Sequence, residues 1–150
     1  MAVNITDLQQ INQLLLCLRE DTPPLWGKMT ARQMVEHLVE QTRYTNGTFE
    51  PTLDFSLEEA QQRKLRAKQN DGPMTRNVNL GPLPSHYEFA DLQSAIDQLI
   101  TELVLFDNHF ATPGVQAIHG GFGPMDREEW VWWHNKHFTH HFTQFGLIEE

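Results

Sequence analysis

Four histidines stand within eight residues in the segment HNKHFTHH, from His134 to His141. At about 100° per residue on a helix, His134, His137 and His141 project within a narrow arc. Trp130 and Phe138 fall on or beside that arc, which indicates that it faces the protein interior. Because a buried imidazole has to be hydrogen-bonded or bound to a metal, packing alone does not account for three of them. The segment therefore predicts a site, and a metal ion is its first candidate occupant.

His137 and His141 are four residues apart, a spacing that brings two helical side chains to about 5–6 Å at Cβ. Two imidazoles so placed can chelate one ion, and zinc-type sites commonly add a third ligand from elsewhere in the chain. His37 is the third candidate, because it lies between Met34 and Leu38 on the apparent core face of another predicted helix. A single core histidine is more often only hydrogen-bonded, so the case for His37 depends on the pair.

The spacings around these histidines argue against other metal sites of helical bundles. Ferritin-like di-iron centres need Glu-x-x-His on two helices, but Met34, His134 and Phe138 stand three residues before the candidate ligands. Gln41 stands where a hemerythrin-like His-x-x-x-Glu element would need its glutamate. Covalent c-type haem needs two cysteines, and the HExxH protease motif is missing. A mononuclear three-histidine site remains, with positions open for water or substrate; non-covalent haem held by two histidines is a weaker alternative.

Further side chains could border such a site, although each also has an ordinary structural explanation. His134 could be a hydrogen-bonded core histidine, and Glu40 could orient the His37 ring or simply lie on the surface. His119 stands in a glycine-rich loop, where lining a pocket and stabilising a turn are equally plausible roles. The remaining candidates are a histidine one residue before His141 and three tryptophans that could wall a cavity or pack in the core: His140, Trp26, Trp132 and Trp133.

Apolar periodicity, capping residues and helix breakers predict four amphipathic helices and one polar surface helix. Their expected ranges are Thr6 or Asp7 to about Arg19, Thr30 to between Thr42 and Asn46, 57 to 69 for the polar helix, about Asp91 to Phe110, and Asp126 to Phe145. No segment gives a strong strand signal, and 111 to 125 is expected to be a loop. The predicted fold is an all-α four-helix bundle forming one domain over 1–150, with a long crossover that lets the second and third long helices run parallel.

Composition limits the expected partners and location. The formal net charge is −9, which argues against nucleic acid because phosphate binding needs clustered Lys and Arg. The single cysteine, Cys17, cannot form an intramolecular disulfide. There is no signal-peptide pattern at the first residues and no apolar run long enough to span a bilayer, so we expect a cytoplasmic protein without a membrane partner. Apolar helix faces also allow a homodimer.

Two groups of motifs resemble the DinB-like (YfiT-like) superfamily, and most closely a branch of it whose activity is uncharacterised. They span most of the chain and consist of Trp26-Gly27-Lys28-Met29-Thr30 with Gln33-Met34 and His37, then His119-x-x-Phe122-Gly123-Pro124, Glu129-Trp130, His137-x-x-His140-His141 and Gln144-Phe145-Gly146. The resemblance implies a four-helix bundle and one divalent metal ion, nickel or zinc, held by His37, His137 and His141. One departure is Gly120, where this branch favours proline.

The same resemblance supplies an expectation for function. Better-understood relatives in the superfamily are transferases and isomerases that use low-molecular-weight thiols, in which a metal would stabilise the thiolate. We therefore expect a metal-dependent protein that takes a small molecule or thiol, as a thiol-dependent transferase or a hydrolase. The alternative is a non-catalytic divalent-metal-binding bundle that serves as a stability or interaction module.

Overall fold

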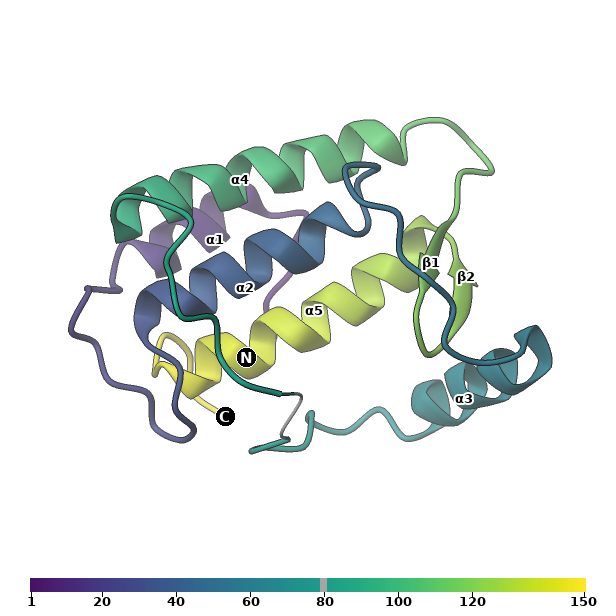
Figure 1. Ribbon diagram of the computed structural model, residues 1–150, viewed down its shortest axis with the longest axis horizontal. Coiled ribbons are helices and arrows are strands. Elements are labelled where there is room, and N and C mark those ends of the chain that lie inside the picture. The colour runs from purple at the N-terminus through teal and green to yellow at the C-terminus, as the bar shows by residue number, and fades with distance from the viewer. Residues whose placement is uncertain (79–80) are drawn as a thin grey trace.

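The computed structural model describes residues 1–78 and 81–150, and within them the chain is mostly helical (Figure 1). Five helices and one two-stranded antiparallel sheet make up the regular structure of the described part. Their bounds are α1 (Leu8–Leu15), α2 (Ala31–Arg43), α3 (Leu57–Gln69), α4 (Leu92–His109), β1 (Ala117–His119), β2 (Gly123–Met125) and α5 (Arg127–Gln144).

Side-chain caps fix where the helices begin. Thr30 and Gln33 form a reciprocal capping box at the start of α2, and Asp126 and Glu129 form another at the start of α5. Each box satisfies backbone N–H groups that have no partner inside the helix. Ser56 caps α3, so this polar helix spans the range that the sequence predicted. Local sequence therefore determined the amino-terminal ends of these helices.

Helices α2 and α4 lie side by side and run in the same direction (Figure 1). At their starts, the Glu20 carboxylate accepts hydrogen bonds from the Arg32 guanidinium and from Leu92 N–H. At the other end, the Asn46 side chain donates to the Glu102 main-chain carbonyl and carboxylate. The long connection between the two helices permits this parallel arrangement. Helix α3, within that connection, lies apart from them and against the β1–β2 hairpin.

Two local expectations were wrong. The first helix ends at Leu15 rather than near Arg19, because the next residues form tighter turns in which Cys17 N–H bonds to the Leu14 carbonyl and Leu18 N–H to the Leu15 carbonyl. Residues 117–125, expected to be loop, contain a short hairpin. Its strands have three residues each, too few to show alternation, and Gly123 at φ +77° begins the second strand.

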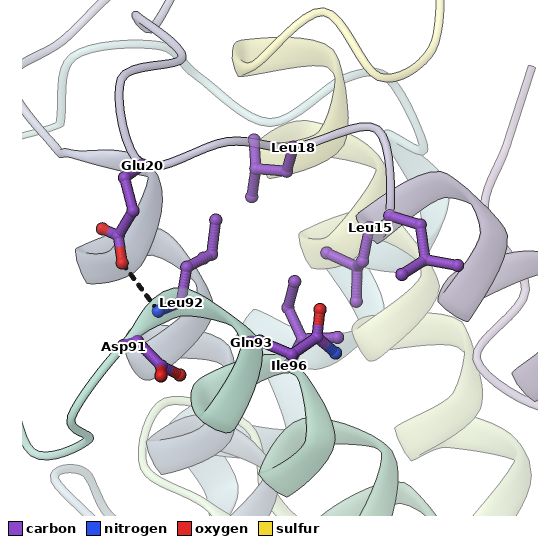
Figure 2. Close-up of a pocket in the computed structure, with 8 residues that line it drawn as sticks. Leu15, Leu18, Glu20, Asp91, Leu92, Gln93 and Ile96 are labelled. Atoms are coloured by element: carbon purple, nitrogen blue, oxygen red, sulfur yellow. Dashed lines mark hydrogen bonds between the residues drawn. The ribbon is translucent and has the colours of Figure 1, made fainter.

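A small cavity of about 340 Å³ lies between the end of α1 and the start of α4 (Figure 2). Its apolar walls include Leu15 and Ile96, and its polar side chains already have structural partners. Glu20 binds Arg32 and Leu92 N–H, and Asp91 caps α4 at Ser94 N–H. This cavity therefore offers no free group for chemistry. Among the described residues, no helix is both long and apolar enough to cross a membrane.

His134 projects from α5 into the protein core, and 1% of its surface is exposed. Its ring stacks on Trp130, with the ring centroids 5.3 Å apart, and its Nε2 lies 3.0 Å from the Thr45 hydroxyl. Because that hydroxyl donates to the Thr42 carbonyl, it accepts from His134 Nε2–H. Burial lowers the pKa of His134 to about 3. His134 is therefore a neutral, hydrogen-bonded core histidine.

His134 should make the unfolding free energy depend on pH. In the unfolded chain His134 is protonated below its ordinary pKa of about 6.5. In the folded chain it stays neutral until the pH falls to about 3. The contribution of this group is therefore fully present above about pH 6.5 and is lost as pH falls, by up to about 1.4 kcal/mol per pH unit. Urea unfolding of His134→Phe between pH 7 and pH 4 should show a shallower loss of stability than the wild type. His86→Phe, at an exposed position, is the control. If unfolding free energy falls equally steeply with pH in all three proteins, the prediction is wrong.

Candidate metal centre

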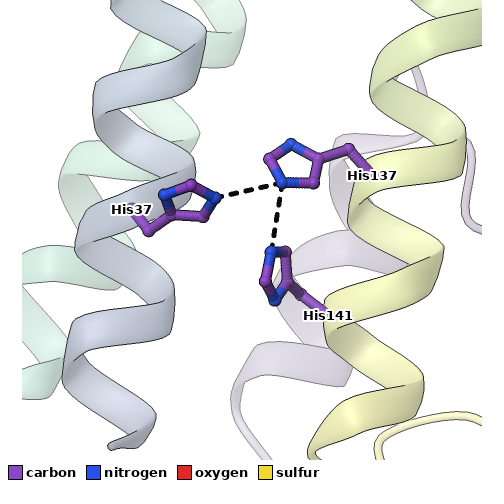
Figure 3. A group of neighbouring side chains, drawn as sticks. All are labelled: His37, His137 and His141. Atoms are coloured by element: carbon purple, nitrogen blue, oxygen red, sulfur yellow. Dashed lines mark hydrogen bonds between the residues drawn. The ribbon is translucent and has the colours of Figure 1, made fainter. Parts of the chain in front are cut away.

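Three histidines from two helices converge on one point (Figure 3). His37 projects from α2, and His137 and His141 project from successive turns of α5. The Nε2 atom of His137 lies 3.0 Å from Nε2 of His37 and 3.1 Å from Nε2 of His141. One ring nitrogen from each residue can be chosen so that all three lie within 4.8 Å of one another. We call these three residues the histidine triad.

The three imidazoles are neutral at physiological pH. Burial, with a smaller contribution from neighbouring histidines, lowers the pKa of His37 to about 4 and that of His141 to about 3. Burial also holds the pKa of His137 well below its usual value, and the other two triad rings add to the effect. A neutral imidazole keeps one nitrogen lone pair, which is what a metal ion requires of a histidine ligand.

Hydrogen bonding cannot satisfy the triad by itself. Each ring nitrogen carries either one proton or one lone pair, so it makes one good hydrogen bond. His137 Nε2 nevertheless faces two other Nε2 atoms, at 3.0 and 3.1 Å. A cation that accepts all three lone pairs removes this conflict. Ligand nitrogens about 2.0–2.1 Å from a shared ion lie roughly 3.0–3.4 Å apart. The two separations that involve His137 fall in this range.

The donor set favours a borderline transition metal. Three imidazoles suit zinc and nickel better than the hard cations calcium and magnesium, which prefer oxygen ligands. Within residues 1–78 and 81–150, the triad is the one group of three or more His, Cys, Asp or Glu side chains close enough to share an ion. With three protein ligands, coordination positions would remain for an exogenous molecule.

A large pocket of about 1630 Å³ borders the triad. Its walls come from α2, α5 and the segments around residues 26–29, 74–78 and 81–88, and all three triad histidines line it. Trp26, Met29, Met74 and Trp133 contribute apolar surface, and Lys136 contributes a charged group. The pocket gives a small molecule a route to the triad.

The structure also shows where the other histidines lie that the sequence suggested as neighbours of the site. His140 lines the pocket, where its ring meets Trp26 edge-on with centroids 5.6 Å apart. His119 is not among the residues that line it. Its Nδ1 accepts from Gly121 and Phe122 N–H groups, so His119 stabilises the turn of the hairpin.

The remaining candidates divide between the pocket and the surface. Glu40 is exposed and borders the pocket. Among the described residues, no hydrogen bond connects its carboxylate to the His37 ring. Trp133 lines the pocket. Trp132 does not; its indole N–H donates to the Asp71 carboxylate. Trp26 lines the pocket and carries Arg76 over its ring at 3.9 Å.

Sequence reasoning gave no role to Gln144, although its side chain contacts the triad directly. Its Oε1 lies 2.8 Å from His141 Nδ1, and the residue is 5% exposed. The spacing of three residues on one helix could have suggested the contact. The second partner of this amide, the Trp26 carbonyl, is 118 residues away, and nothing in the sequence pointed to it.

Comparison with known proteins adds no relative: no protein-family model matches the chain, and no significant match is found among curated proteins or solved structures. What supports metal binding at this site is therefore the geometry of its three histidines.

The triad should bind one divalent ion per chain. Protein purified without a nickel column and titrated with zinc against a competing chelator should show one site. His37→Ala, His137→Ala and His141→Ala should each lower affinity by more than the roughly 10–100-fold typical of losing a residue that only orients a ligand. His86→Ala, which lines the same pocket outside the triad, is the matched control and should bind as the wild type does. Zinc binding that survives all three triad substitutions would place the site elsewhere.

Proposed function

We propose that this chain is a metal-dependent protein of the DinB-like superfamily, in which α1, α2, α4 and α5 form the four-helix bundle. In this proposal it acts on a small molecule, as a thiol-dependent transferase or a hydrolase. The observation that carries the proposal is the convergence of three neutral imidazoles at the wall of a large pocket. The motif resemblance supports the family, and the site geometry supports the metal.

His37, His137 and His141 would hold the ion, which we propose to be zinc or nickel. When bound, such an ion lowers the pKa of a coordinated thiol or water and so raises the population of the nucleophile near neutral pH. The chain's own contribution is to keep the three lone pairs available and directed to one point. Trp26, Met29 and Trp133 present apolar surface beside that point, which would exclude water from a bound substrate.

Charge supports a small-molecule partner over nucleic acid. The chain carries a formal net charge of −9, so phosphate-rich polymers would meet repulsion rather than attraction. Glu36, Glu40 and Glu88 line the pocket together with Lys28 and Lys136. A mixed-charge wall of this kind suits a small polar ligand better than a polyanion. A cytoplasmic location, with its supply of reduced thiols, agrees with this proposal.

A non-catalytic role is the second candidate, and the position of the triad between two helices is compatible with it. The triad joins α2 to α5 through residues 100 positions apart in the chain, so a shared ion would act as a crosslink. An ion present at 100 times its dissociation constant would add about 2.7 kcal/mol to the unfolding free energy. Both candidates predict this stabilisation, so only binding and turnover of a small molecule separate them.

Thiol binding tests the catalytic proposal. Protein loaded with cobalt(II) in place of the native ion should gain a thiolate-to-cobalt charge-transfer band when 2-mercaptoethanol is added. Ethylene glycol, which has hydroxyls in place of the thiol, should give no such band, and neither should His37→Ala. With an electrophilic co-substrate, loaded protein should consume the thiol faster than chelator-treated protein. Metal binding without thiol binding or turnover would favour the non-catalytic role.

A further inference from the structure

The side chain of Gln144 bridges the triad and a distant loop. It is 5% exposed, at the carboxyl end of α5. Its Oε1 lies 2.8 Å from His141 Nδ1, and its Nε2 lies 3.0 Å from the main-chain carbonyl of Trp26. Both polar ends of the amide are therefore engaged, one by a triad residue and one by the backbone.

The Trp26 carbonyl fixes the direction of this amide. A carbonyl oxygen can only accept, so the NH₂ end of Gln144 must face Trp26 and the oxygen must face His141. The amide oxygen can also only accept, so His141 Nδ1 must carry the proton. The lone pair of His141 then lies on Nε2, the atom that faces the other two triad rings.

We propose that Gln144 is a positioning residue that selects the Nδ1–H tautomer of His141 and holds its Nε2 lone pair ready for a metal ion. Ligand histidines commonly donate their second N–H to an oxygen that fixes tautomer and ring orientation. Here a main-chain carbonyl 118 residues away sets the orientation of that oxygen. The metal-binding consequence rests on the function proposed above, whereas the choice of tautomer does not.

The loop beside Gln144 is shaped to hold the amide. Leu25 N–H donates to the main-chain carbonyl of Gln144 at 2.7 Å, which brings residues 25–27 against the end of α5. Gly27 follows at φ +79°, and a Cβ there would lie 2.9 Å from Gln144 Nε2. A residue with a Cβ would be strained at this φ and would displace the Gln144 amide, whereas glycine does neither. His137 differs from His141 in this respect, because its buried Nδ1 has no hydrogen-bond partner among the described residues.

Two substitutions separate the bond to His141 from the bond to Trp26. Gln144→Glu keeps an oxygen acceptor for His141 Nδ1–H but loses the donor to the Trp26 carbonyl, and Gln144→Met loses both. Zinc affinity, measured by chelator competition, should fall about 10–100-fold in Gln144→Met and stay within a few-fold of wild type in Gln144→Glu. Thr143→Val, a buried neighbour whose hydroxyl donates to the Thr139 carbonyl of the same helix, is the control and should bind zinc normally.

Each other pattern overturns the proposal. Equal weakening in Gln144→Glu and Gln144→Met would mean that the loop contact, and not the His141 proton, is what matters. Wild-type affinity in both would mean that the amide has no influence on the ligand.

A spectroscopic measurement tests the tautomer without any metal. In ¹⁵N-labelled apo wild-type protein, the imidazole nitrogen shifts should identify His141 as the Nδ1–H form, and Gln144→Met should lose that preference. Gly27→Ala, which displaces the amide without altering it, should have a similar effect. An Nε2–H tautomer of His141 in the wild type would overturn the proposal. If wild-type protein binds no metal, the proposed function fails while the tautomer result still decides the role of Gln144.

Discussion

Three neutral ring nitrogens meet in a buried space between α2 and α5, and the surrounding fold has to hold them together. Two contacts of 3.0 and 3.1 Å converge on a single nitrogen that can make one hydrogen bond. Leaving buried polar groups without partners costs roughly 1–3 kcal/mol each. The fold must supply enough packing energy to hold α2 and α5 in a position that the triad alone does not favour.

That packing surrounds the triad on both helices. On α5, the fully buried rings of Phe138 and Phe142 anchor the face from which His137 and His141 project. On α2, Met34 and Leu38 are fully buried on either side of His37. Helix α2 is in turn joined to α4 by the ion pair of Arg43 with Glu102, a residue that is 3% exposed. The triad therefore lies between two helices whose positions are already held by apolar packing and by the buried contacts of Glu102.

Much of this arrangement could be predicted from local sequence. Capping residues placed the starts of the helices, and helical periodicity placed His134, His137 and His141 on an inward face, because both signals act within a few residues. The hairpin at 117–125 was missed because its strands are too short to show a period. The early end of α1 was missed because Leu18 stays buried outside the helix, so the apolar pattern continues past the last helical turn. His37 could be identified as a candidate because it lies on the apolar face of its helix. The role of Gln144 could not, because it depends on a carbonyl 118 residues away.

The three imidazoles are not equivalent, and their difference bears on how the site would work. His141 has its second nitrogen bonded to Gln144, and that of His137 is buried without a described partner. His37 comes from the other helix and is less buried than the pair on α5. A site built in this way has one ligand whose proton position is set in advance and two that can adjust to an incoming ion. Preorganising one ligand lowers the cost of binding, and the pocket beside all three leaves room for a further ligand. Crosslinking the helices and presenting an ion to a small molecule are therefore compatible roles for the same three nitrogens.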